Sequence, residues 1–187
     1  MKPLYVVSTI VAFGLVSSAA GAQNLLHLRS RSHAEPSKEQ AVFTAEDNGV
    51  HEPVAIPDEI KMVLAKDEYV ANLLDQKKLT AQKLPAAWFS AAEVHLAGHK
   101  EDDLIVMGEG PVRGADGTTF WVFCSTPHGY VQALKVSTHT LLVKDLRTKG
   151  AKEIEAQTAS ASEVFSVAYR FDGLQYRSYR ELSEPIR

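Results

Sequence analysis

Residues 165–176, Phe-Ser-Val-Ala-Tyr-Arg-Phe-Asp-Gly-Leu-Gln-Tyr, decide the fold class of this 187-residue chain. Apolar side chains occupy every second position from Phe165 to Phe171, which is the period of a strand. Asp172 and Gly173 are the two-residue signature of a tight hairpin turn, after which residues 174–179 return as a second strand. The sequence therefore predicts an antiparallel hairpin at the end of the chain.

Shorter stretches with a strand-like pattern precede this hairpin. They are residues 91–96, 104–107, 120–125, 131–136, 141–146 and 154–158. The run from Leu104 to Met107 is apolar at every position, which is typical of a central strand covered on both faces. Six to eight short strands in all, joined by tight turns, predict a twisted antiparallel sheet or half-barrel.

One amphipathic helix is predicted ahead of the strands, over residues 57–76. Pro57, Asp58 and Glu59 suit a first helical turn, where the missing N–H of proline is harmless and the helix dipole favours negative charge. Apolar residues then recur at helical spacing, at Ile60, Val63, Leu64, Val70, Ala71 and Leu74. The fold class that we expect is α+β, with this N-terminal helix packed on one face of the sheet.

The first 22 residues have the pattern of a secretory signal peptide. Lys2 precedes an almost wholly apolar run from Leu4 to Val16, and small residues suited to cleavage stand at 20–22. This run is too short to span a bilayer, and no later run is long enough. We therefore expect a secreted or periplasmic chain with no membrane span, a flexible polar segment over 23–56 and a single domain over 57–187.

Charge and cysteine content narrow the function classes. The formal net charge of −3 lacks the basic excess of a nucleic-acid binder, so no nucleic-acid partner is expected. Cys124 is the only cysteine, so the chain cannot form an internal disulfide. The glycine-rich loop at 108–117 leads into a strand, whereas a nucleotide site needs a helix N-terminus there. No cofactor is therefore expected.

One pair of histidines would suit a metal-dependent enzyme. His95 and His99 are four positions apart, and Glu101, Asp102 and Asp103 follow them closely. Imidazole and carboxylate groups are zinc ligands, so these side chains could converge on one ion. The alternative is a solvated, charged turn at the end of a strand, without any metal.

A second pair would suit a small hydrolase with a cysteine nucleophile. Cys124 and His128 are close in sequence, and a thiol needs a neighbouring base to become reactive. However, Cys124 shares the phase of Phe120 and Val122 on a predicted strand, which favours a buried and inert thiol.

Tyrosine and arginine side chains gather in the last strands, and we take them as candidate binding residues. They are Arg170, Tyr176, Arg177 and Tyr179, to which Tyr130 in an earlier turn is added. Tyrosine and arginine anchor many protein interfaces, because they combine a large contact area with directed hydrogen bonds. The alternative is that the tyrosine rings face the core while the arginine heads lie in water.

Three strings resemble a pattern of uncharacterised secreted bacterial proteins. They are Asp103–Met107 followed by Gly108-x-Gly110-Pro111, then Phe120–Phe123, then Tyr169–Gly173 with Tyr176. The resemblance implies kinship but carries no activity and no functional residue. The Pro127–Tyr130 loop is a loose analogue of the loop by which some periplasmic lysozyme inhibitors enter their enzyme, although the Ser-Gly-x-x-Tyr string of that family is absent.

The function expected from these observations is that of a secreted or periplasmic, non-enzymatic binding protein. Its partner would be a protein or a glycan of the cell envelope. One alternative is a small secreted hydrolase or metal-dependent enzyme that uses His95 and His99 with nearby carboxylates, or Cys124 and His128. The other is an inhibitor or immunity-type protein that neutralises one cognate enzyme. The sequence does not distinguish this function from that of an envelope-binding protein, because a protein interface has no short sequence motif.

Overall fold

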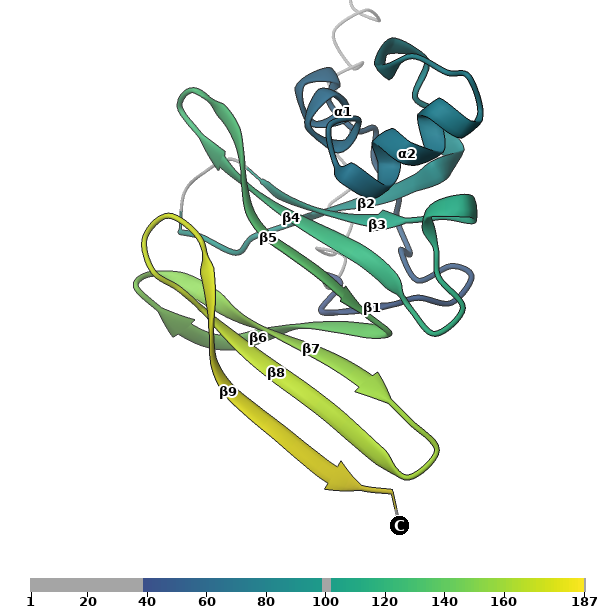
Figure 1. The fold of residues 1–187 in the computed structure, drawn as a ribbon. Coiled ribbons are helices and arrows are strands. Elements are labelled where there is room, and N and C mark those ends of the chain that lie inside the picture. The colour runs from purple at the N-terminus through teal and green to yellow at the C-terminus, as the bar shows by residue number, and fades with distance from the viewer. Residues whose placement is uncertain (1–38, 99–101, 187) are drawn as a thin grey trace, which may run out of the picture. The chain divides into compact units, whose positions relative to one another are not determined.

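The computed structural model describes residues 39–98 and 102–186. Within them the chain forms two antiparallel sheets and two α-helices (Figure 1). The first sheet contains β2 (Phe89–Val94), β3 (Asp103–Gly108), β4 (Thr118–Thr126) and β5 (Gly129–Thr138), in this order. The second sheet contains β1 (Val42–Thr44), β6 (Thr140–Thr148), β7 (Ala151–Ala159), β8 (Glu163–Phe171) and β9 (Tyr176–Pro185), in this order. The predicted signal peptide at 1–22 lies outside the described residues, as do residues 23–38 of the predicted polar segment.

A sharp corner between β5 and β6 carries the chain from the first sheet to the second. His139 alone separates the two strands, and its backbone N–H donates to the carbonyl of Gln157 on β7. The buried Thr138 side chain donates to the same carbonyl over 2.6 Å. These bonds to β7 fix the corner, because they satisfy polar groups that no longer have a strand partner in the first sheet.

The main core lies between the two sheets. Ile105 and Met107 of β3 point toward the second sheet, where they join Phe43, Leu141 and Ile154 in one buried cluster. The alternate residues of β3 point to the opposite face of the first sheet and are buried there as well. The apolar run of β3 is thus covered on both faces, as its sequence predicts.

The helices cover the outer face of the first sheet. They are α1 (Asp58–Leu64) and α2 (Glu68–Gln76), and their buried residues Ile60, Leu64, Val70 and Leu74 belong to a second core with Trp88, Phe89 and Trp121. The sequence predicts one continuous helix over 57–76, and the structure differs there. Asp67 caps α2 by accepting the Tyr69 N–H, and its carboxylate also binds the Trp121 indole and Lys135 of the sheet. Because these bonds hold Asp67 against the sheet as the N-cap of α2, one helix ends before this residue and the next begins after it.

Strand β1 lies in a segment that the sequence predicts to be polar and flexible. Phe43 at its centre is fully buried between the sheets, and the strand pairs antiparallel with β6 from Val42↔Leu142 to Thr44↔Thr140. One large aromatic side chain provides the burial that an otherwise polar segment lacks. A segment of only three strand residues gives no alternation from which to predict it.

The terminal hairpin is confirmed as β8 and β9, but the predicted two-residue turn is wrong, because the four residues 172–175 separate the strands and β9 begins at Tyr176. Phe171 pairs with Tyr176 across a loop in which the Asp172 side chain accepts the N–H groups of Leu174 and Gln175, and Gly173 has φ +110°. An antiparallel α+β arrangement is therefore present, with nine strands in the described residues where six to eight are expected. The strands belong to two sheets, and the half-barrel stays a prediction.

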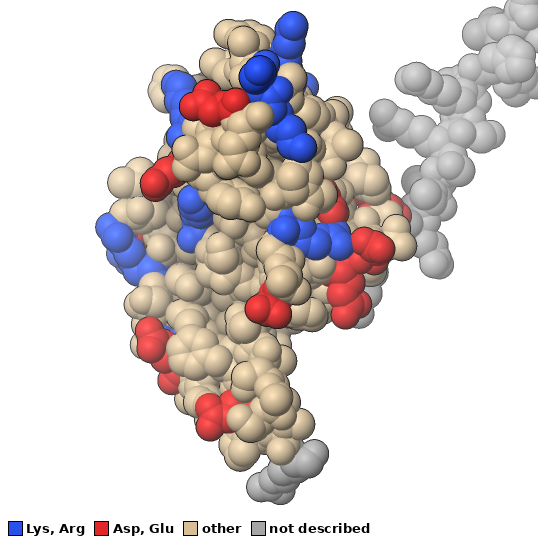
Figure 2. All heavy atoms as spheres, turned by 45° about the vertical axis from the view of Figure 1, so that its right-hand side comes forward, with Lys and Arg blue, Asp and Glu red and all other residues tan. Residues whose placement is uncertain are grey.

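Charges of both signs occupy the surface. On the face in Figure 2, basic side chains gather at the upper end, where the helices lie, and acidic ones predominate at the lower end. In the stretches 39–98 and 102–186, no helix has the length and apolar character to cross a membrane. The expectation that no nucleic acid is bound stays a prediction.

Candidate functional site

An arginine and a tyrosine stack against each other on the outward face of the second sheet. Arg170 of β8 places its guanidinium carbon 3.7 Å from the ring centroid of Tyr179 on β9. The Arg170 side chain is 47% exposed and Tyr179 is 37% exposed, so both remain accessible to a partner. The geometry is that of a cation–π contact, in which the ring face attracts the positive charge.

A buried glutamate beneath this pair holds both side chains in place. Glu153 of β7 is only 3% exposed, and its carboxylate accepts from Arg170 Nε at 2.8 Å and from the Tyr179 hydroxyl at 2.6 Å. The Thr148 hydroxyl donates to the same carboxylate over 2.6 Å. Burial alone would raise the pKa of Glu153, but these three hydrogen bonds outweigh it and hold the pKa below its usual value. The bond to Glu153 in turn raises the pKa of Tyr179.

A hollow of about 170 Å³ lies beside the stacked pair. Its lining includes Glu153, Glu155, Arg170 and Tyr179, together with Lys144, Leu146 and Arg180, and we call these seven residues the Arg–Tyr face. Lys144 pairs with the buried Glu155 at 3.1 Å, and the apolar Leu146 is 61% exposed. Arg180 lies 5.9 Å from the Tyr179 ring and makes no hydrogen bond or ion pair with any described residue. The face thus combines fixed aromatic and apolar area with one cation available for a ligand.

A bulge in β9 brings Arg180 to the outward side. Ala168 pairs with Arg180 while Tyr169 pairs with Ser178, so Tyr179 is an extra residue opposite that step. Strict alternation would put Arg180 on the face opposite to Arg177, but one extra residue reverses the alternation. Tyr179 and Arg180 consequently share the hollow with side chains of β6, β7 and β8.

The five predicted binding residues do not form one cluster. Arg170 and Tyr179 come together as described, and Arg177 lies opposite Arg170 in the ladder, where it pairs with Asp172. Tyr176 points the other way, into the core between the sheets, and its hydroxyl donates to the Lys152 carbonyl over 2.9 Å. Tyr130 belongs to the first sheet, where its hydroxyl donates to the Asp102 carbonyl over 3.3 Å.

The two glutamates of the Arg–Tyr face, Glu153 and Glu155, are absent from the binding residues that the sequence predicts. Glu153 and Glu155 alternate around Ile154, which is buried on the opposite, core side of β7. Two carboxylates at period two within a strand point to one face, so this spacing could have placed them together. Nothing in the sequence pairs them with Arg170, Lys144 or Tyr179, because those contacts cross between strands.

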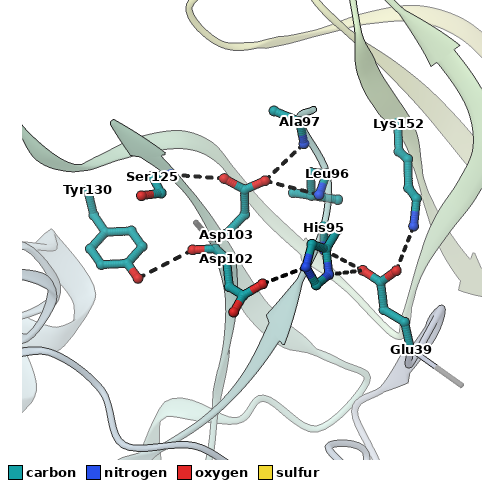
Figure 3. A network of polar contacts seen from close by, with 9 residues as sticks. All are labelled: Glu39, His95, Leu96, Ala97, Asp102, Asp103, Ser125, Tyr130 and Lys152. Carbon is teal, nitrogen blue, oxygen red and sulfur yellow. Dashed lines mark hydrogen bonds and ion pairs between the residues drawn. The ribbon is translucent and has the colours of Figure 1, made fainter. Parts of the chain in front are cut away.

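His95 lies between two carboxylates at one end of the sheets (Figure 3). Its Nε2 is 2.8 Å from Asp102 Oδ1, its Nδ1 is 3.8 Å from Glu39 Oε1, and its backbone N–H also donates to Glu39. Glu39 in turn pairs with Lys152 of β7 at 2.8 Å. The described residues contain no group of three or more His, Cys, Asp and Glu side chains that could hold a metal ion. His99 and Glu101, which the metal hypothesis also uses, lie outside the described residues.

Asp103 points away from His95 and serves as a structural acceptor. Its fully buried carboxylate accepts the backbone N–H groups of Leu96 at 3.0 Å, Ala97 at 2.9 Å and Ser125 at 2.9 Å (Figure 3). The carboxylate therefore ties the end of β2 to the end of β4. The three hydrogen bonds satisfy a polar group that would be costly to bury without partners.

Cys124 has the environment of an inert thiol. It lies in the core between the sheets, and burial, assisted by the nearby negative charge of Asp103, raises its pKa to about 12. A thiol with that pKa stays protonated at neutral pH, whereas a nucleophilic cysteine needs a lowered value. His128 lies in the exposed turn after β4, where its backbone N–H bonds to the Thr126 hydroxyl.

Comparison of the chain with protein-family models, with curated proteins and with solved structures gives no significant match. The three strings of the sequence resemblance fall on β3, on β4 and on the β8–β9 hairpin, and the kinship stays a prediction. The case for a function therefore comes from the geometry of the sites.

Proposed function

We propose that the chain is a secreted or periplasmic, non-enzymatic binding protein that holds a protein partner of the cell envelope on the Arg–Tyr face. The export signal expected in residues 1–22 supports the compartment. The Arg170–Tyr179 pair supports the binding role.

The observation that carries the proposal is the fixed but accessible state of this pair. Glu153 holds both side chains from below, yet each keeps a large part of its surface in water. A side chain that is already ordered loses less conformational entropy on association, by about 0.5–1.5 kcal/mol for each one. Arginine and tyrosine held in this way have the properties of interface anchors.

Charge and apolar area favour a protein over a glycan. The guanidinium of Arg180 can form a bidentate pair with a carboxylate, which acidic side chains of a protein supply. The exposed Leu146 beside it offers apolar contact that a side chain of a protein would cover. The expected partner is therefore a protein whose binding surface combines an acidic and an apolar side chain. A cognate enzyme neutralised by this chain would fit the same description.

Site-specific photo-crosslinking tests the proposal. A photoreactive phenylalanine derivative replaces Leu146 in one sample and Lys83, an exposed residue of the helical layer, in a control. Both proteins are irradiated in an envelope extract, and the crosslinked species are identified by mass spectrometry. We expect one dominant protein adduct from position 146 and none of that species from position 83. Equal adducts from both positions would overturn the proposal. Loss of the adduct after periodate oxidation would identify the partner as a glycan instead of a protein, which would also overturn it.

The purified partner then gives a quantitative check. Replacing Arg180 with alanine should weaken binding about tenfold, as expected for an interface anchor that has no hydrogen bond or ion pair with a described residue. Lys83→Ala, in contrast, should leave the affinity unchanged. An Arg180→Ala protein with wild-type affinity would remove this surface from the interface.

A further inference from the structure

A second, apolar pocket lies between the ends of the two sheets. It has a volume of about 500 Å³, and its lining comes from the segment after β2, from β4 and β5, and from the β6–β7 and β8–β9 turns. The tips of the β4–β5, β6–β7 and β8–β9 hairpins lie along one side of the molecule in Figure 1. The volume is in the range of sites that take small molecules.

The pocket wall is mainly apolar. Val131 of β5, Phe171 of β8 and Leu174 of the terminal turn contribute large side chains, with Ala97 and Cys124 beside them. Leu174 is 68% exposed, so a ligand in the pocket could cover it. Covering this side chain and its neighbours with an alkyl chain would be favourable by about 0.8 kcal/mol for each methylene buried.

One cation stands among these apolar residues. Among the described residues that line the pocket, Lys149 in the β6–β7 turn is the one with a charged side chain. Its ammonium donates to the carbonyl of Asp172 over 2.8 Å, and it has no carboxylate partner among the residues that the structure places. An ammonium keeps further donors for a ligand after one such bond.

The wall is fixed from behind by the Asp103 carboxylate. It binds the backbone N–H groups of Ala97 and Ser125, and both residues line the pocket (Figure 3). Arg147 adds a second tie, since its Nη1 donates to the carbonyls of Leu96 and Gly150 at 3.1 and 2.9 Å. The opening is therefore held in shape without a ligand, which reduces the entropy lost on binding.

We propose that this pocket binds a single-chain alkyl carboxylate, with the alkyl chain between the sheets and the carboxylate on Lys149. The apolar wall selects the alkyl chain, and the ammonium of Lys149, which has no carboxylate partner among the described residues, selects an anionic head. This site is separate from the Arg–Tyr face, so it adds a small ligand to the proposed protein partner.

Calorimetric titration of the purified chain with straight-chain carboxylates of 6, 8 and 10 carbons, below their micellar concentrations, tests the proposal. We expect affinity to rise about fourfold for each added methylene, the factor that corresponds to its burial. The alcohol of the same length should bind about tenfold more weakly, because it lacks the charge. Affinity that is independent of chain length, or equal for alcohol and carboxylate, would overturn the proposal.

Two matched lysine variants separate the head contact from damage to the fold. Lys149 has φ +51° and Lys78, at the end of α2, has φ +55°, and asparagine tolerates this conformation well. Lys149→Asn should weaken decanoate binding about tenfold and leave decanol binding unchanged, whereas Lys78→Asn should change neither. Equal effects of the two variants would contradict the assigned site. Binding to anionic phospholipid vesicles without binding to free decanoate would show that the pocket binds membrane lipids, and this result would contradict the proposal as well.

Discussion

Removing the Asp103 side chain should be one of the most damaging single changes in this protein. Asp103→Ala deprives three backbone N–H groups of their acceptor, and the bonds of Leu96 and Ser125 are buried. An unsatisfied buried donor costs about 1–3 kcal/mol, while the part-buried N–H of Ala97 can turn partly to water. The expected loss in the free energy of unfolding is about 4 kcal/mol. Stabilities of about 5–15 kcal/mol are typical, so this loss is a large fraction of the total.

The adjacent carboxylate supplies the control. Asp102 pairs with His95, whose side chain is largely exposed, so Asp102→Ala should cost less than about 1 kcal/mol. Asp103→Asn keeps one carbonyl oxygen as an acceptor and should lie between the two alanine variants, at about 2 kcal/mol. Urea unfolding followed by the fluorescence of the buried Trp88 and Trp121 measures all three. An Asp103→Ala protein within 1 kcal/mol of the wild type, or no less stable than Asp102→Ala, would refute the assignment of Asp103 as the acceptor that joins the strands.

Three further predictions concern single residues. Because the pKa of Glu153 is lowered in the fold, its carboxylate should stabilise the protein above the usual value of 4.5 and lose this contribution as pH falls further. The stability difference between wild type and Glu153→Gln in urea titrations should therefore shrink below pH 4.5, and a difference that grows on acidification would contradict the assigned hydrogen bonds. The pKa of the Cys124 thiol is raised to about 12, so the thiol should react with a disulfide reagent at pH 7.4 at least about 30-fold more slowly in the native than in the urea-unfolded chain. Similar rates would show an accessible thiolate. Gly49→Ala places a Cβ 1.9 Å from the Thr44 carbonyl oxygen and should cost about 2–3 kcal/mol. Gly98→Ala meets no atom of the described residues within 4 Å and should be neutral in the same assay, so equal stabilities of the two variants would count against the packing at Gly49.

The local sequence pattern was sufficient to predict features that depend on a single strand or a single turn. The unbroken apolar run of β3 predicts burial on both faces, and the Asp172–Gly173 step predicts the position of the terminal turn, although not its length of four residues. Each of these features depends on side chains within a few positions of one another. The period of the side chains along a strand is read directly from the sequence in such cases.

Features that depend on contacts between distant segments could not be predicted. The apolar spacing of residues 60–74 continues through the break between α1 and α2, since the break comes from the bonds of Asp67 to Trp121 and Lys135. The division into two sheets depends on the corner at His139, which is held by a carbonyl of β7. Neither contact leaves a periodic signal in the chain.

The candidate site illustrates the same limit at the level of single residues. Arg170 and Tyr179 are recognisable as interface-forming types, but the bulge at Tyr179 decides which of the later residues share their face. Glu153, which organises the pair, is an ordinary alternating carboxylate when viewed in sequence. Its role follows from burial and from three donors that reach it from other strands and turns.

The proposed function depends on Glu153, which would prepare Arg170 and Tyr179 for a partner. The most direct test is the affinity of the crosslinked partner, once purified, for the wild-type protein and for Glu153→Gln at pH 7. Glu153 is only 3% exposed, so the effect of the substitution is expected to pass mainly through the Arg170 and Tyr179 side chains that it holds. With circular dichroism confirming the fold, binding should weaken about tenfold, the cost of ordering two released side chains. An unchanged affinity would contradict the account.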